Sequence, residues 1–199
     1  RPYWVTYPEQ VRMSGATPVF VDGAEEDGFK LTPEALEQSI TPRTRGLLLN
    51  YPSNPTGACY SADELRPIAD LCVRHGIWMV ADEIYSRLVF DGRVFTSVAS
   101  LSDAARDWTV VIDGMSKAWS MTGWRIGFAA GPTDVIAAMS RLQSHATSNA
   151  TSISQWAALA ALSVGREELD RRAEAFQSRR DRIVAGLRAL PGVTCVTPE

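Results

Sequence analysis

One lysine in a glycine-rich loop is the residue of this sequence best suited to chemistry. The apolar run over residues 108–112 predicts a buried strand that stops at Asp113, and Lys117 and Arg125 follow in the next loop. Ligands of open α/β sheets bind beyond the carboxyl ends of the strands, so Lys117 would project into that crevice. Arg125 offers a planar fork that suits a phosphate. The pair favours an anionic cofactor, although a solvated lysine and a surface arginine are the commoner explanation of such residues taken alone.

Two more predicted strands end in polar residues. Asn50 and Asn54 follow one apolar run, and Asp82 and Tyr85 follow the next. Because the carboxyl ends of parallel strands meet at the same edge of a sheet, we expect these side chains to share one crevice with Lys117.

The residue types at this edge suit a particular cofactor chemistry. A lysine amine such as that of Lys117 can form a Schiff base with an aldehyde. The carboxylate of Asp82 can keep a pyridine nitrogen protonated, which makes the ring an electron sink. Tyr85 and Asn54 can donate hydrogen bonds to a ring oxygen, and Arg125 can hold a phosphate. Together these residues describe a site for pyridoxal 5′-phosphate, although each alone has a simpler explanation as a cap, a core tyrosine or a turn.

The elements that must position these residues alternate between strand and helix. Apolar runs over 46–50 and 77–81 predict buried strands, and Thr32 and Ser61 are expected N-caps, the latter with Glu64 in a capping box. The alternation over residues 17 to 113, which includes an apolar segment over 17 to 21, predicts an α/β fold with a mostly parallel sheet and helices on both faces.

The second half of the chain is expected to be largely helical. A short strand over 128–132 precedes a helix that Thr133 would cap, and residues 152–163 predict a more buried helix. Residues 166–190 are strongly charged but keep an apolar stripe, which predicts a solvated connecting helix. An apolar segment begins at residue 193.

Composition excludes several classes of function. The formal net charge of −3 over 199 residues argues against a nucleic-acid partner, because neutralising phosphates needs a basic face. We also expect no membrane span and no metal site, since there is no long apolar run and the chain has only two histidines. Three scattered cysteines fit a reducing compartment, so we expect a cytoplasmic protein.

Three motifs together resemble a known family. They are NPTG at residues 54–57, DEIY at 82–85, and SK at 116–117 followed by GWRIG at 123–127. With these motifs the chain resembles the class I/II pyridoxal-phosphate-dependent aminotransferases of fold type I, over essentially its whole length. The aspartate-aminotransferase branch is the most similar.

The resemblance implies a role for each residue already singled out. Lys117 would be the Schiff-base lysine and proton shuttle, Asp82 would pair with the pyridine nitrogen, and Tyr85 would contact the ring oxygen. The other implied cofactor contacts are Asn54 to the ring oxygen, Arg125 to the phosphate and Trp4 stacked on the ring. Many members carry a phosphate-binding hydroxyl three residues before the lysine, where this chain has Gly114. We therefore expect a shallower or differently completed phosphate site.

The resemblance also implies an organisation. Members are about twice as long as this chain and form homodimers that act on amino acids and 2-oxo acids. Residues 1–185 would be part of the large cofactor-binding domain, and residues 186–199 would begin a small α+β domain. The Asn54–Pro55 bond is a candidate for the cis form.

Two alternatives stay open. A carbon–sulfur or cyclopropane-forming lyase of the same fold would share every cofactor residue named above. The second alternative is a non-catalytic, aminotransferase-like effector-binding domain of a transcription regulator, which would need an N-terminal pair of DNA-binding helices.

Overall fold

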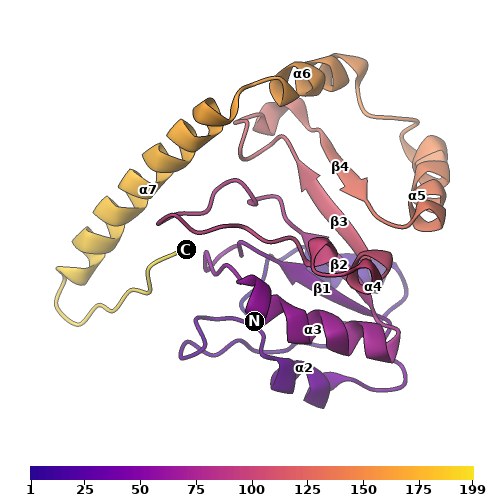
Figure 1. The fold of residues 1–199 in the computed structure, drawn as a ribbon, viewed down its shortest axis with the longest axis horizontal. Helices are drawn as coiled ribbons and strands as arrows, with labels where there is room; N and C mark the ends of the chain where they lie inside the picture. Colours follow the sequence, from indigo (N-terminus) through magenta and orange to yellow (C-terminus); the bar gives the residue numbers. More distant parts are fainter.

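A four-stranded sheet forms the centre of the protein, whose computed structural model describes residues 1–199 (Figure 1). The strands are β1 (Gly46–Asn50), β2 (Trp78–Asp82), β3 (Thr109–Gly114) and β4 (Gly127–Ala130), and they lie side by side in that order. The β1–β2 and β2–β3 pairs are parallel, whereas β4 runs antiparallel to β3. The expectation of an α/β fold with a mostly parallel sheet is confirmed.

The register aligns the strand ends that carry the candidate residues. Asn50 pairs with Asp82, and Asp82 pairs with Ile112. Paired residues of neighbouring strands project to the same face and the next residues project to the other. Asn50 and Asp82 therefore share one face, while Tyr51 and Glu83 turn toward the opposite, buried face.

Three helices cover that buried face. They are α2 (Pro33–Ser39), α3 (Ala62–His75) and the short α4 (Asp103–Asp107). The expected caps are present: the Thr32 hydroxyl caps α2, and Ser61 and Glu64 form the capping box of α3. These helices and the strands enclose the main core, whose largest fully buried members are Tyr51, Leu65, Ile68, Ile77, Val98, Thr109 and Cys72.

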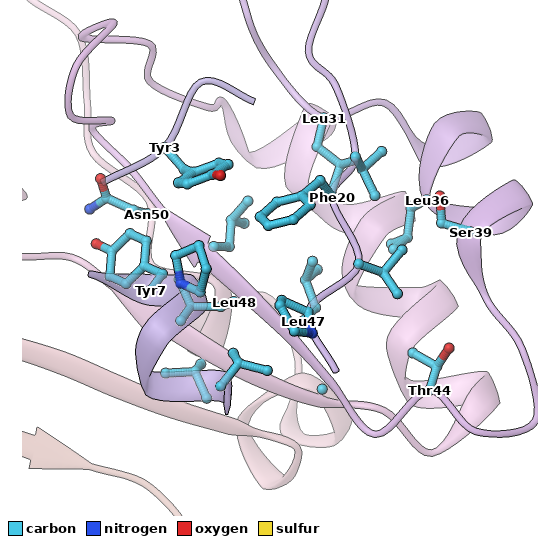
Figure 2. A pocket seen from close by; sticks show the side chains of 18 of the residues that line it. Tyr3, Tyr7, Phe20, Leu31, Leu36, Ser39, Thr44, Leu47, Leu48 and Asn50 are labelled. Carbon is cyan, nitrogen blue, oxygen red and sulfur yellow. The ribbon is translucent and has the colours of Figure 1, made fainter. Parts of the chain in front are cut away.

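The other face of the sheet is covered less completely. Only the seven-residue helix α1 (Tyr7–Met13) packs there, beside the half-buried Leu48 and Val80. A cavity of about 750 Å³ lies between β1 and the chain that surrounds α1 (Figure 2). Figure 2 shows Tyr7 next to Asn50 at one end of this cavity and the apolar side chains of Phe20 and Leu47 farther along it. Helices thus lie on both faces, as expected, but unequally.

Several local expectations were wrong. Residues 17–21 pair with no strand, so their apolar side chains do not mark a fifth strand, and Val19 and Phe20 remain exposed. The third strand does not stop before Asp113, because pairing with β4 carries it on to Gly114. Thr133 is the first residue of α5 (Thr133–Ala146) and not its cap, since Pro132 takes the cap position and no side chain caps the helix.

The helix expected to be buried is also largely exposed. α6 (Ser152–Leu162) forms as predicted, but Ile153 and Trp156 are 69% and 73% exposed. Its composition is apolar on all sides, which normally indicates burial. Within residues 1–199 only the side that carries Ser154, Ala158 and Ala161 is buried, because no other element packs on the rest.

The charged helix α7 (Arg166–Arg188) extends from the sheet, and the chain after it returns without regular structure (Figure 1). Arg180 fastens α7 through paired hydrogen bonds of 2.7 Å to both carboxylate oxygens of Asp91, and its side chain is 8% exposed. The Glu199 N–H donates to the carbonyl of Gly57 at 2.9 Å, which returns the last residues to the loop after β1. The domain boundary expected after residue 185 lies inside α7.

No helix in the structure combines the length and the apolar character that crossing a membrane requires.

Candidate active site

Asp82 ends β2 and faces α1. The Tyr7 phenol donates a hydrogen bond of 2.6 Å to Oδ2 of Asp82, and the Ile84 N–H donates to Oδ1 at 3.2 Å. Burial, followed by the contact with Asp82, raises the pKa of Tyr7, so this phenol is a neutral donor at physiological pH. Asp82 is therefore held by donors on both oxygens, and a carboxylate has lone pairs for more.

Asn54 stands in the loop between β1 and α3. Its N–H donates to the side-chain carbonyl of Asn50 at 2.9 Å, and the Asn50 amide in turn donates to the backbone carbonyl of Asp82 at 3.0 Å. These two bonds tie the loop to the end of the neighbouring strand. The Asn54–Pro55 bond is cis, as expected.

Tyr85 lies next to both Asn54 and Lys117. The Asn54 amide lies 3.4 Å from the Tyr85 hydroxyl, and Nζ of Lys117 lies 5.2 Å from the centroid of the Tyr85 ring. An ammonium over an aromatic face at this distance is attracted by the ring. The Asn54 amide, the Tyr85 phenol and the half-buried Lys117 amine therefore lie close together, just beyond the end of β2.

The loop over residues 115–126 carries both Lys117 and Arg125 and is closed at its neck by two paired glycines. A Cβ on Gly114 would lie 2.8 Å from the Cα of Gly127, so a side chain there would force the strands apart. The far part of the loop is fastened to α6, because Nε1 of Trp119 donates to the carbonyl of Ala161 at 3.0 Å.

Arg125 and Trp4 are placed less tightly. Arg125 is exposed, has a positive φ of 50°, and donates to the carbonyl of Thr122 at 3.0 Å. Trp4 is 46% exposed, and its carbonyl accepts from the N–H of Tyr7 at 3.2 Å. Neither side chain makes a hydrogen bond or an aromatic contact with the other candidate residues. The structure thus brings together Asn54, Tyr85 and Lys117, with Asp82 adjoining, and leaves Arg125 and Trp4 at the margin.

A half-buried and a fully buried carboxyl group, those of Asp113 and Glu83, lie beside this cluster. Asp113 accepts from the Ser86 hydroxyl at 3.1 Å, and Glu83 accepts from Tyr51 and Ser97 on the reverse side of the sheet. Burial is the main cause that raises the pKa of both carboxyl groups.

Sequence reasoning missed Tyr7 and Glu83. Glu83 could have been found, since a glutamate at the end of a buried strand beside Asp82 must alternate to the opposite face. Nothing in the sequence pairs Tyr7 with Asp82. The position of the 750 Å³ cavity does not indicate the candidate residues either. Tyr7 and Asn50 line the cavity, but Asp82, Tyr85 and Lys117 do not.

Comparison with known proteins agrees with the geometry. An aspartate aminotransferase of Geobacillus stearothermophilus is 51% identical over 198 residues, and an aspartate/prephenate aminotransferase of Cereibacter sphaeroides is 51% identical over 199. All of this chain is covered in both alignments, but only 50% of either relative, so the chain spans about half their length.

Solved structures give the same result. The crystal structure of the aspartate aminotransferase from Rhizobium meliloti superposes with a TM-score of 0.97 at 46% identity, over 100% of this chain and 50% of the other. An aromatic aminotransferase from Pyrococcus horikoshii gives 0.94 at 32% identity, over 100% and 53%. The sequence profile of the family described as aminotransferase class I and II matches residues 1–199, and the chain belongs to this family.

Proposed function

We propose that the whole protein is a pyridoxal-phosphate-dependent aminotransferase that moves an amino group between an L-amino acid, aspartate among them, and a 2-oxo acid. The observation that carries the proposal is the meeting of Lys117, Tyr85 and Asn54 beside Asp82. The names of the relatives support the choice of aspartate. This chain spans about half of those relatives, so the activity is proposed for the complete protein.

The donor set fits the proposed cofactor. When bound, pyridoxal phosphate supplies an aldehyde that can join an amine and a pyridine ring that accepts electrons. The cluster offers one amine, one carboxylate, and a phenol and an amide 3.4 Å apart that can donate to one oxygen. Each polar group of the cofactor ring therefore has a matching partner.

Asp82 would hold a proton on the ring nitrogen. An anionic carboxylate favours a protonated nitrogen at hydrogen-bond distance. The 2.6 Å bond from Tyr7 and the bond from the Ile84 N–H would keep the carboxylate in one orientation. Tyr7 is thus a positioning residue in this proposal, while Asp82 touches the cofactor.

Lys117 would carry the proton between the α-carbon of the amino acid and the C4′ carbon of the cofactor. A lysine does this only while its amine is free and unprotonated. The Tyr85 ring under Nζ restricts where the amine can move. The Tyr85 hydroxyl and the Asn54 amide would donate to the ring oxygen.

Arg125 would bind the phosphate and Trp4 would cover one face of the ring. The loop that holds Arg125 begins and ends at the paired glycines Gly114 and Gly127, so Arg125 and Lys117 belong to one loop at the end of the β3–β4 pair. Gly114 has no hydroxyl to offer a phosphate, and Arg125 is the cationic group of this loop suited to bind one. Homodimer formation, a cytoplasmic location and a small domain that starts at residues 186–199 belong to the same proposal.

The proposal is tested on the complete protein. Purified protein should bind pyridoxal phosphate, and borohydride should fix the cofactor to Lys117, as peptide mass spectrometry can establish. With aspartate and 2-oxoglutarate, amino transfer should give oxaloacetate and glutamate in equal amounts. Release of a thiol or a cyclopropane product without amino transfer would favour a lyase, and failure to bind the cofactor would favour an effector-binding domain.

A further inference from the structure

Glu83 is a buried carboxyl group directly behind the candidate site. It is 4% exposed, and its Oε1 atom accepts hydrogen bonds from the Tyr51 phenol at 2.9 Å and the Ser97 hydroxyl at 2.7 Å. The Tyr51 oxygen also accepts from the Val98 N–H at 2.8 Å. The second carboxylate oxygen, Oε2, makes no hydrogen bond within the chain.

The Tyr51–Glu83 bond joins the two loops that carry the candidate residues, and Ser97 and Val98 support it from the segment that precedes α4. Tyr51 begins the loop that holds Asn54, and Glu83 lies between Asp82 and Tyr85. Backbone hydrogen bonds of the sheet extend to both residues. The Tyr51 N–H donates to the Asp82 carbonyl at 3.2 Å, and the Glu83 N–H donates to the Ile112 carbonyl at 2.8 Å. A shift of Glu83 would therefore move the turn from Asp82 to Tyr85 relative to Asn54.

A purely structural core would not need an ionisable group at this position. Burial of a carboxyl group is unfavourable unless its hydrogen bonds compensate, and an apolar side chain of similar size often stabilises a fold at least as well. Tyr51 is itself wholly buried, with its ring stacked on Phe95 and edge-on to Tyr60. This packing fixes the position of the Tyr51 hydroxyl independently of Glu83. The hydroxyl can therefore hold the Glu83 carboxylate in one place.

We propose that Glu83 is a positioning residue: the hydrogen bond that it accepts from Tyr51, supported by the one from Ser97, sets the distance between the Asp82–Tyr85 turn and the loop of Asn54. The part of this inference that concerns the cofactor rests on the function proposed above. Glu83 acts through its accepting oxygen and not through its charge. Glutamine keeps that oxygen and can replace it, whereas alanine cannot.

Four variants of the complete protein test the inference. Glu83→Ala removes the acceptor, Glu83→Gln keeps it, and Tyr51→Phe removes one donor with little change of shape. Thr109→Val is the matched control, because it removes another buried hydrogen bond, from Thr109 Oγ1 to the Ala105 carbonyl at 2.6 Å, at the opposite end of the sheet. Each variant is compared with the parent by thermal melting, by amide hydrogen exchange without cofactor and by pyridoxal phosphate titration.

Loss of the acceptor should loosen both loops. Glu83→Ala should speed exchange in residues 50–57 and 82–88, weaken pyridoxal phosphate binding about tenfold, and shift the pH midpoint of the bound cofactor's absorbance. Tyr51→Phe should do the same to a smaller extent, and Glu83→Gln should stay within about twofold of the parent. Thr109→Val should lower the melting temperature but leave cofactor affinity and the absorbance midpoint unchanged.

Two results would overturn the inference. One is a Glu83→Ala protein that melts earlier but keeps the parent's loop exchange, affinity and absorbance midpoint, since Glu83 would then be a stability residue only. The other is a Glu83→Gln protein as impaired as Glu83→Ala, which would assign the effect to charge. Failure of the parent protein to bind pyridoxal phosphate would overturn the proposed function instead, and the exchange measurement without cofactor would still decide whether Glu83 fixes the loops.

Discussion

The phenol of Tyr7 and the carboxylate of Asp82 are joined by a 2.6 Å hydrogen bond although 75 residues separate them in the sequence. Tyr7 belongs to α1, the only helix on its side of the sheet, and Asp82 is the last residue of β2. The bond therefore fixes a short peripheral helix to the central strand. It also gives the group proposed to face the pyridine nitrogen a defined orientation.

Replacement of Tyr7 by phenylalanine should slow transamination without unfolding the protein. The variant loses one hydrogen bond to a charged acceptor, worth about 1.5–3 kcal/mol, so we expect a fall in kcat of roughly ten- to hundredfold. Steady-state kinetics of the complete protein measure it. Tyr3→Phe is the control, because the Tyr3 ring stacks on Phe20 and its hydroxyl makes no hydrogen bond; an equal loss in both variants would contradict the assigned role of Tyr7.

Replacement of Lys117 by alanine should abolish the borohydride-reducible link to the cofactor and nearly all transamination. The only other lysine of this chain, Lys30, is engaged by Glu64 at 3.0 Å and by Glu199 at 3.2 Å. Lys30→Ala should consequently keep the link. The measurement is mass spectrometry of the reduced protein together with amino-transfer assays, and substantial activity of Lys117→Ala without an added amine would rule out the enzyme proposal.

Replacement of Tyr85 by phenylalanine should raise the pH midpoint of the absorbance change of the bound cofactor by about one unit. The ring oxygen would lose one of its two proposed donors, which leaves the Asn54 amide alone to stabilise its negative charge. A spectrophotometric pH titration measures the midpoint. Tyr60→Phe serves as the control, since the Tyr60 hydroxyl accepts from the Leu31 N–H away from the cluster. An unchanged midpoint in Tyr85→Phe would remove Tyr85 from the site.

Stability should depend on pH through Glu83 in a defined direction. Burial raises the pKa of Glu83 above its ordinary value of about 4.3, against the hydrogen bonds from Ser97 and Tyr51, which lower it. The folded protein thus binds this proton more tightly than the unfolded chain does. Its contribution to stability is complete below pH ~4 and is lost as the pH rises through the folded pKa.

Glu83→Gln isolates this contribution. The free energy of unfolding of the variant, relative to that of the parent, should increase as the pH rises above about 4.5. The reason is that glutamine has no proton to lose. Urea unfolding of the cofactor-free protein at several pH values measures the difference. Asp113 also has a raised pKa, and its charge raises the pKa of Glu83, so the difference between the two proteins includes the repulsion between these two carboxyl groups. A difference that shrinks with rising pH would show that Glu83 is stabilised as an anion.

Arg180→Ala should release α7 from the rest of the chain. Its guanidinium donates to both oxygens of Asp91 and to the carbonyl of Pro198, and these are the contacts that hold the middle of α7 to the rest of the chain. Hydrogen exchange over residues 166–188 should accelerate. Arg179→Ala, which removes an exposed neighbour without an ion pair, should leave exchange unchanged.

The sequence was sufficient to predict elements that are set by local rules. The capping box of Ser61 and Glu64 and the N-cap Thr32 both depend on residues within one turn, and both were found. The apolar runs located the buried strands β1 to β3. The clustering of Asn54, Tyr85 and Lys117 followed from one topological rule about parallel sheets.

Long-range contacts could not be predicted in this way. Apolar character alone suggested a strand at residues 17–21 and a buried α6, but pairing and burial depend on which elements pack nearby, and a local pattern carries no information about them. The antiparallel pairing that lengthens β3 to Gly114 is of the same kind. So is the approach of Tyr7 to Asp82, which requires α1 to lie across the sheet.

The glycine neck at Gly114 and Gly127 has a mechanical consequence. Between these paired residues the chain makes a closed circuit that leaves the sheet and returns to it at the same rung, with Lys117 near its start and Arg125 near its end. Both ends of the loop are held at one pair of facing residues, so the loop joins the sheet at a single point. The distance between the amine and the guanidinium therefore depends on the conformation of the loop and on its attachment to α6 through Trp119, and not on the register of the parallel strands.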